Sequence, residues 1–318
     1  MQGIKDKKKD PIKTIFALDA IFATITAIAS SLVLFIIAGI LIVLITKSWL
    51  SIKEFGVIGF IFSTDWDPVH KVFGAAASIY GTLVTTGFAM LIAVPSAIGI
   101  AIFVTEIAPN SLKSPIATAI ELLAAIPSII FGMWGLFTLA PIMSEYIEPA
   151  IQITLGRLPI VGAVFSGTTL GIDLFTASII LSIMILPFTA SVSRDAFNLT
   201  PSIVKESAYA MGATQWEVIR DIVIPFSRRG VFGGIILSLG RALGETMAVA
   251  FVLGNNHQIT ASLFNAAATI TVTLANEFTE ADSDIYLSSL FYLALILFVM
   301  SFVILAIAKY FLVKSRNE

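Results

Sequence analysis

The sequence predicts an all-α protein that crosses a membrane six times. Hydrophobic residues make up 57% of its 318 residues and charged residues only 13%, against roughly 25% charged residues in a soluble domain. The mean hydropathy is +0.96. Long, almost uncharged runs recur along the chain, and about 20 such residues suffice for a helix to cross the hydrocarbon core of a bilayer. These observations exclude an ordinary soluble domain.

The six predicted spans are separated by loops of very different length. From the N-terminus, they cover about residues 16–46, 80–105, 115–140, 174–193, 230–253 and 285–308. Pro95, Pro127 and Pro187 lie within the second, third and fourth spans. Proline removes a backbone donor and crowds the preceding turn, so we expect bends or breaks there that neighbouring helices support.

The distribution of basic residues predicts the orientation. Fourteen Lys and Arg residues fall in the segments on one side of the spans, and four fall on the other side. Because cytoplasmic loops carry the excess of basic residues, both termini are expected in the cytoplasm. The cytoplasmic segments are then residues 1–15, 194–229 and 313–318, and the extracytoplasmic loops are residues 47–77 and 254–284. Spans two to six form a core within residues 78–312, and the first span is expected to stay uncleaved because it is too long for a signal peptide.

The polar segment between spans four and five has the pattern of two short helices joined by a turn. Thr200 and Pro201 are expected to start the first helix, and Gly212 is expected to end it with left-handed backbone. A capping box that begins at Thr214 would start the second helix, and Pro225 is expected to stop or kink it.

This segment resembles the "EAA" loop of ABC importer permeases, whose pattern is Glu-Ala-Ala, three residues, Gly, nine residues, Ile, one residue, Leu, Pro. The chain departs from that pattern only at Ser207 and Ile224. The resemblance implies a cytoplasmic coupling helix that contacts an ATPase subunit. The candidate contact residues are Glu206, Ser207, Ala208, Gly212, Ile222 and Pro225. An amphipathic linker between two spans is the alternative interpretation.

The fifth predicted span carries two charges, Arg241 and Glu245, on one helical face. An arginine at the centre of a membrane helix costs about 2.5–3.5 kcal/mol on insertion scales, so its presence calls for an explanation. The two residues could neutralise each other as a structural pair. Alternatively, Arg241 contacts an anion on a translocation path and Glu245 is its counter-charge or gate partner. A guanidinium fork fits tetrahedral oxyanions such as phosphate or sulfate, and Gly240 and Gly244 would let another helix approach closely.

Several kinds of site are absent from the sequence. It has no phosphate-binding Gly-x-x-x-x-Gly-Lys-Ser/Thr loop, no cysteine and no clustered metal ligands. The only histidines, His70 and His257, fall in predicted outer loops and are expected to be solvated rather than ligands. No nucleophile and base stand out, so an enzyme is not expected. We expect no cofactor, no metal and no nucleic-acid partner, and any energy for transport must come from another subunit.

Three blocks of sequence resemble the PstC-type permeases of phosphate-specific ABC importers. The first block covers residues 62–83 and contains Asp65-Trp66-Asp67-Pro68, the second covers residues 121–135, and the third covers residues 240–248. They follow one another in order over roughly residues 60–254. The resemblance implies a type I ABC importer permease fold. It also implies that Arg241 and Glu245 are tied to phosphate passage.

The same resemblance implies a function and partners. The chain would be the permease subunit of an ATP-driven importer that passes inorganic phosphate across the cytoplasmic membrane of a prokaryote by alternating access. Its partners would be a second related permease, P-loop ATPase subunits, an extracytoplasmic phosphate-binding protein and membrane lipid. The acidic segment at Asp65 and Asp67 is expected either to contact the binding protein or to form only a turn.

Three alternatives to this function remain. The chain could be the sister permease of the same importer, or a permease for another oxyanion such as sulfate or molybdate. It could also be an ion-coupled secondary transporter, which would need its own coupling groups and would have no use for an ATPase-docking loop.

Overall fold

In the part of the chain that the structure describes, the regular secondary structure consists of helices joined by loops. The computed structural model describes residues 11–159 and 161–314, and among these residues there are no strands, only two isolated bridges. Six helical segments there are long and apolar enough to cross a membrane: Ile21–Phe55, Ala76–Ile107, Ser128–Arg157, Leu174–Asn198, Gln215–Leu243 and Asp284–Leu312. The predicted fold class and number of spans are confirmed. Residues 1–10 and 315–318 of the predicted terminal segments lie outside the described residues.

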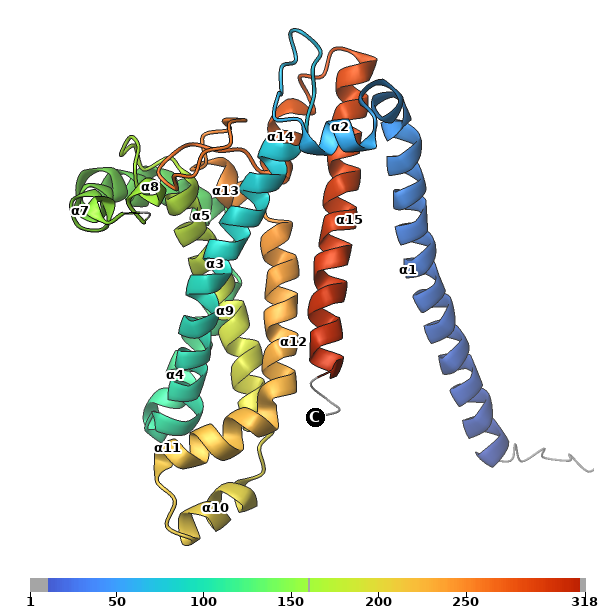
Figure 1. Ribbon diagram of the computed structural model, residues 1–318. Coiled ribbons are helices and arrows are strands. Elements are labelled where there is room, and N and C mark those ends of the chain that lie inside the picture. Colours follow the sequence, from blue (N-terminus) through green and yellow to red (C-terminus); the bar gives the residue numbers. More distant parts are fainter. Residues whose placement is uncertain (1–10, 160, 315–318) are drawn as a thin grey trace, which may run out of the picture.

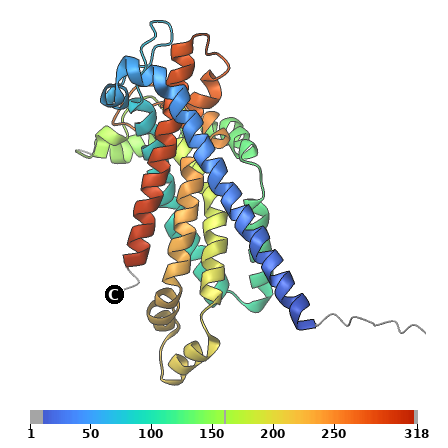
Figure 2. The same cartoon turned by 90° about the vertical axis from the view of Figure 1, so that its right-hand side faces the viewer.

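A bundle of long helices forms the body of the molecule (Figure 1). It contains α3 (Ala76–Ile102), α9 (Leu174–Asn198), α12 (Ile224–Leu243) and α15 (Asp284–Lys314). One more long helix, α1 (Pro11–Phe55), lies apart from the bundle over most of its length and runs obliquely to the other long helices (Figure 2). The N-terminal end of α1 and the C-terminal end of α15 both point towards the end of the bundle that carries α10 (Figure 1).

Small residues allow the central helices to pack closely. The interface between α3 and α9 is the most extensive one between two helices. α3 has a buried small residue at every fourth position, namely Ala77, Gly81, Thr85, Ala89, Ala93, Ala97 and Ala101. Of these, Ala89 and Ala93 pack in one cluster with residues of α9, and so does Ala101 in another, whereas Gly81 faces the loop at Ala268. Lipid gives no hydrophobic drive for helices to associate, so membrane helices depend on close packing of this kind. Pro95 and Pro187 lie inside α3 and α9, which continue through them.

The predicted third span, residues 115–140, does not match the third membrane-length segment, Ser128–Arg157, because the chain is broken between two helices there. These helices are α4 (Asn110–Ala124) and α5 (Ser128–Trp134), which are separated by an extended residue at Pro127 (ψ 138°). The expected break at this proline is therefore confirmed. Beyond α5, the chain continues through short helical segments that include α6 (Ala140–Ile142), α7 (Glu148–Thr154), a 3₁₀ turn at Leu155–Arg157 and α8 (Val161–Val164).

The fifth span differs from its prediction. A continuous helical run begins with α11 (Gln215–Val218), passes through a π-helical turn at Ile219–Val223 and ends with α12 at Leu243. The prediction of a span over residues 230–253 is wrong at its C-terminal end, because the helix ends at Leu243. After Leu243 the chain leaves the helix, and residues 247–250 form a separate short helix, α13 (Met247–Ala250). A prediction from hydropathy does not detect this break, because residues 246–253 are uncharged.

At the end of the bundle opposite α10, the long loops fold into a compact cap. It includes α2 (Val57–Phe62) and α14 (Ile270–Glu277), as Figure 1 shows. Within the predicted outer loop of residues 254–284, helix is therefore present only from Ile270 to Glu277 before α15 begins. Next to the cap, α15 is fastened to α1, because the Ser51 N–H donates to Ser288 Oγ (3.0 Å) and Ser288 Oγ donates to the Lys47 carbonyl (2.7 Å).

A buried carboxylate, Glu277, holds the cap together. It accepts hydrogen bonds from Trp66 Nε1 (2.6 Å) and from the Tyr286 hydroxyl (2.7 Å). The Asn255 side chain also hydrogen-bonds to it, and burial raises the pKa of the Glu277 carboxyl above its ordinary value. One side chain therefore joins the loop before α3, the loop after α13, α14 and α15.

Candidate functional site

The polar segment between spans four and five folds as the sequence predicts, into two short helices joined by a turn. The first helix is α10 (Ser202–Ala210), and Gly212 follows it with φ of 89°. Gly212 N–H donates to the Tyr209 carbonyl (3.0 Å), and Ala213 N–H donates to the Ala208 carbonyl (3.1 Å). This pair of bonds is a Schellman motif, which satisfies the free carbonyls at a helix end. The predicted role of Gly212 is confirmed.

The start of the second helix is also as predicted, whereas the predicted cap at Thr200 is wrong. Thr214 and Glu217 form the expected capping box at the start of α11. Thr200 does not cap α10; Pro201 occupies the cap position and the buried Thr200 hydroxyl has no hydrogen-bond partner among the described residues. Pro225 does not stop the helix, but it stands in the first turn of α12 directly after the π-helical turn, where the run bends between α11 and α12 (Figure 1), so a kink, the other predicted outcome, is present. A π-helical turn has a wider hydrogen-bond spacing that can accommodate a missing N–H.

The α10–α11 element has one buried face and one exposed apolar face. Ala208 is only 5% exposed and belongs to a buried cluster with Ala101 and Phe197, against which Ile222 also packs. Glu206, Ser207 and Pro225 are exposed. Large apolar side chains are exposed on the same element, namely Leu199, Ile203, Val204, Tyr209, Met211 and Trp216. An exposed patch of this kind, at the far end of the molecule from the cap (Figure 1), is typical of a surface that another protein covers.

Replacing Gly212 with alanine is expected to destabilise this turn. A left-handed backbone costs a residue with a Cβ about 1–2 kcal/mol, although no atom outside the turn would obstruct the new methyl group. Hydrogen exchange of the amides of residues 208–217 should therefore become faster in Gly212→Ala. The matched control is Gly233→Ala, since Gly233 lies within α12 with open space around it and without a positive φ. Equal protection in the two variants would contradict the role given to Gly212.

Arg241 lies in the last turn of α12, and not at a helix centre. Its side chain is exposed, and it makes no ion pair or hydrogen bond with any described residue. Arg241 and Glu245 therefore do not form the structural pair that was one of the two interpretations. A guanidinium beside the C-terminal carbonyls of a helix is favoured by the helix dipole. Its donors nevertheless stay free to bind an anion.

Glu245 has a different local role. Its Oε1 accepts a hydrogen bond from Ala248 N–H (3.2 Å), so the carboxylate caps the short helix α13. Its own carbonyl accepts a hydrogen bond from Thr271 Oγ1 (2.7 Å) in α14. Glu245 thereby fixes the break between α12 and α13 and links it to the cap. Arg241 and Glu245 flank an interrupted helix, which in membrane transporters is a frequent setting for ion and substrate sites.

The two glycines beside this break have different surroundings. A Cβ added at Gly240 would lie 3.5 Å from Leu305 of α15, an ordinary contact distance. A Cβ added at Gly244 would meet only carbonyl oxygens of its own helix, at 3.7 Å or more. The predicted close approach of another helix thus applies to Gly240. The side of the chain next to Gly244 is open.

The acidic segment in the cap forms a turn, one of its two predicted roles. Asp67 Oδ1 accepts from the N–H groups of Val69 (2.9 Å) and His70 (3.2 Å), and Asp67 pairs with Val72 in an isolated bridge. The exposed His70 ring binds Asp67 Oδ2 (2.6 Å), and this hydrogen bond holds the pKa of the Asp67 carboxyl below its usual value. The other predicted role, contact with a binding protein, stays a prediction.

His257 is not the solvated loop residue that the sequence predicts. Its ring stacks on Trp66 with centroids 5.4 Å apart, and Nε2 lies 3.1 Å from Thr273 Oγ1. Its side chain is only 13% exposed, and burial lowers its pKa to about 4. Together with Trp66, it forms part of the wall of a polar hollow of about 650 Å³ in the cap, which is also lined by Asp65, Asp67 and Asn256.

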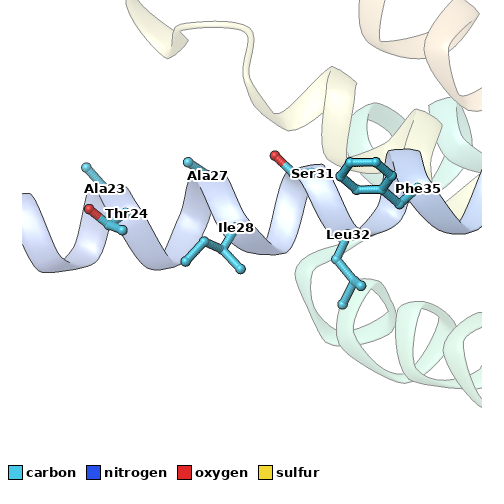
Figure 3. Close-up of a pocket in the computed structure, with 7 residues that line it drawn as sticks. All are labelled: Ala23, Thr24, Ala27, Ile28, Ser31, Leu32 and Phe35. Carbon is cyan, nitrogen blue, oxygen red and sulfur yellow. The ribbon is translucent and has the colours of Figure 1, made fainter.

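Another hollow belongs to α1 alone. Figure 3 shows its seven lining residues, all on that helix, with the small residues Ala23, Ala27 and Ser31 in a row along one side. A single helix cannot enclose a ligand, and small residues at this spacing allow another membrane helix to approach. Among the described residues, no group of three or more histidine or acidic side chains has the arrangement of a metal site.

Comparison with known proteins identifies relatives over nearly the whole chain. Residues 97–317 match the family described as binding-protein-dependent transport system inner membrane component. The chain is 50% identical over 314 residues to the phosphate transport system permease protein PstC of Mesorhizobium japonicum, with 99% of this chain and 96% of the relative covered. It is 49% identical over 300 residues to the protein of the same name from Haemophilus influenzae, with 94% and 95% covered.

Solved structures have the same fold at much lower identity. A chain of a bacterial ABC transporter involved in the import of the acidic polysaccharide alginate matches with a TM-score of 0.58 and 17% identity, covering 95% of this chain and 97% of that chain. At this identity the likeness shows the fold alone, which is that of a type I ABC importer permease. Sequence and fold lead to one conclusion: the chain belongs to the family of binding-protein-dependent transport system inner membrane components and, within it, to the PstC-type permeases.

Proposed function

We propose that this chain is the membrane-spanning permease subunit of an ATP-driven importer of inorganic phosphate. The observation that carries this proposal is the identity of about half of all residues, over almost the full length, to proteins named as phosphate transport system permeases. These relatives carry the name PstC, which favours this subunit over its sister permease. The exposed Arg241 guanidinium at a helix break supplies suitable chemistry, since it offers a planar set of donors to a tetrahedral oxyanion.

The α10–α11 element is the proposed docking surface for an ATPase subunit. Glu206 and Ser207 are exposed on it, and the exposed apolar side chains next to them, such as Met211, would be covered by the partner. Gly212 sets the turn between the two helices, while Ala208 and Ile222 attach the element to the bundle. Pro225 marks where the element passes into α12. Closure of the ATPase subunits on ATP would move this element, and hydrolysis would reset it.

This function assigns a direction to the molecule. The end with α10 would face the cytoplasm of a prokaryote, in agreement with its basic loops, and both described chain ends point to it (Figure 1). The cap would face outwards and receive a phosphate-loaded binding protein. The exposed Arg241 and the open side at Gly244 would face a second, related permease, so that the path for phosphate runs between the two subunits. Alternating access would open this path first outwards and then inwards.

Uptake of labelled phosphate by the reconstituted importer tests the proposal. The assay contains this chain, its sister permease, the ATPase and the loaded binding protein in vesicles, with and without ATP. Uptake that requires ATP and resists excess sulfate and molybdate supports a phosphate importer. Because a guanidinium also binds other tetrahedral oxyanions, a second candidate function is a sulfate or molybdate permease, and competition by either anion would favour it. Uptake driven by an ion gradient without ATP would refute both.

A further inference from the structure

The end of α3 nearest to α10 carries a glutamate that the sequence analysis did not single out. Glu106 lies in the π-helical turn Phe103–Ile107, which continues α3. Its side chain is only 8% exposed, although this end of the bundle faces open space. Its Oε1 lies 2.6 Å from Lys205 Nζ, and the Lys205 side chain is 20% exposed. The two residues are 99 positions apart in the sequence, so the contact joins two distinct elements.

Both helices of the α10–α11 element hold this same residue. Lys205 reaches it from α10, and the Gln215 side-chain amide at the start of α11 donates to the Glu106 backbone carbonyl (2.8 Å). Behind these polar contacts, Ala208 packs into the apolar cluster that contains Ala101 of α3. The α10–α11 element is thereby fastened to α3 at three points close together.

Neighbouring residues of α10 lie on different sides of the helix, about 100° apart around its axis. The Lys205 side chain is mostly buried towards α3, whereas the next residue, Glu206, is exposed on the proposed ATPase surface. A movement of the ATPase subunit against the exposed face of α10 would therefore also displace the Lys205 side chain on the same helix. A short, charge-assisted and largely buried contact resists sliding better than apolar packing does, because separating the two charges leaves a buried carboxylate unpaired.

The helix at the other end of this contact is the central one of the bundle. α3 has the most extensive interface with α9 and also packs against α12, which carries Arg241. A displacement that reaches α3 is consequently passed on to both of these helices. No other described side chain of α10 makes an ion pair with α3.

We propose that the Glu106–Lys205 ion pair transmits movement of the α10–α11 element to α3 and so couples ATP hydrolysis to phosphate movement. The proposal rests on the proposed function of this chain. Glu106 and Lys205 are positioning residues that touch neither phosphate nor ATP. Their removal should therefore separate hydrolysis from transport while the ATPase stays bound.

The test uses the complete importer in vesicles and measures three quantities: ATPase subunits retained on purification, ATP hydrolysed, and phosphate imported per ATP. The variants are Glu106→Gln, Lys205→Gln and the reversed pair Glu106→Lys with Lys205→Glu. The matched control is Glu145→Gln, the same chemical change at an exposed glutamate of the turn Met143–Ile147. We expect each single variant to keep its ATPase and to import about tenfold less phosphate per ATP, within the range of coupling free energies between sites. The reversed pair should restore most of this yield.

Three results would overturn the proposal. The first is an unchanged yield of phosphate per ATP in both single variants. The second is loss of the ATPase from either single variant, which would make the pair a docking or folding contact. The third is uncoupling that the reversed pair leaves uncorrected, since the effect would then not depend on the ion pair. These results differ from a failure of the proposed function itself. In that case the importer with the unaltered chain would already show no ATP-dependent phosphate uptake.

Discussion

Replacement of Arg241 with alanine is expected to abolish phosphate uptake without unfolding the protein. Two charge-assisted hydrogen bonds from a guanidinium fork contribute about 1.5–3 kcal/mol each, so their removal should slow uptake by about a hundredfold or more. The folded state should change little, because Arg241 makes no ion pair with another described residue. Initial rates of labelled phosphate uptake, together with melting temperatures of the purified complexes, measure the two effects.

Two further variants sharpen this prediction. Arg241→Lys keeps the charge but loses the planar fork, and is therefore expected to retain only part of the uptake. Arg157→Ala removes an exposed arginine from the segment after α7 and should leave uptake within about twofold of the unaltered protein, as surface substitutions usually do. Normal uptake by Arg241→Ala would remove this residue from the path. A large loss of stability would instead restore the structural interpretation of the Arg241 and Glu245 charges.

The second large effect is expected at Glu277. Truncation to alanine leaves the Trp66 and Tyr286 donors of the cap without their acceptor, and each buried donor left unsatisfied costs about 1–3 kcal/mol. Glu277→Ala should therefore melt at a markedly lower temperature, with early exposure of Trp66. Glu277→Gln keeps a side-chain acceptor and should be much less affected. Similar melting of Glu277→Ala and the unaltered protein would show that the cap does not depend on this residue.

The same residue predicts a pH dependence. Because burial raises the folded-state pKa of Glu277 above its ordinary value of 4.5, the native state holds its proton more firmly than the unfolded chain does. Its contribution to stability is therefore fully present below about pH 4.5 and is lost as the pH rises through the folded-state pKa. His257 has the opposite effect on stability. Because burial lowers its folded-state pKa from 6.5 to about 4, the unfolded chain takes up a proton first, and the protein loses stability as the pH falls below 6.5. The difference between the unaltered protein and Glu277→Gln isolates the glutamate, and a difference independent of pH would contradict the assignment.

The parts of the structure that the sequence predicted depend on local chemistry. The apolar runs predict the six membrane-length helices, since composition alone decides which segments can lie in lipid. Gly212 and the capping box at Thr214 predict the α10–α11 turn, since each signal acts within about four residues. These features need no knowledge of distant residues.

The errors arise where distant parts of the chain meet. His257 is buried because Trp66, almost two hundred positions away, stacks on it. Glu106 has its partner 99 positions away, and no spacing in the sequence connects them. The end of α12 at Leu243 is set by the Glu245 cap on α13 and by the Thr271 bond, whereas the hydropathy of the following residues continues without change.

The long helix α12 has a mechanical consequence. The helical run bends where α11 passes into α12 (Figure 1), so the lever that carries Arg241 is α12 alone, and it measures about 26 Å from Ile224 to Arg241 at a rise of 1.5 Å per residue. If this rod pivots at the bend, a tilt of only about 10° carries Arg241 sideways by about 4 Å. That distance exceeds the length of a hydrogen bond. A modest rotation beneath the membrane would thus be enough to engage or release an anion near its outer side.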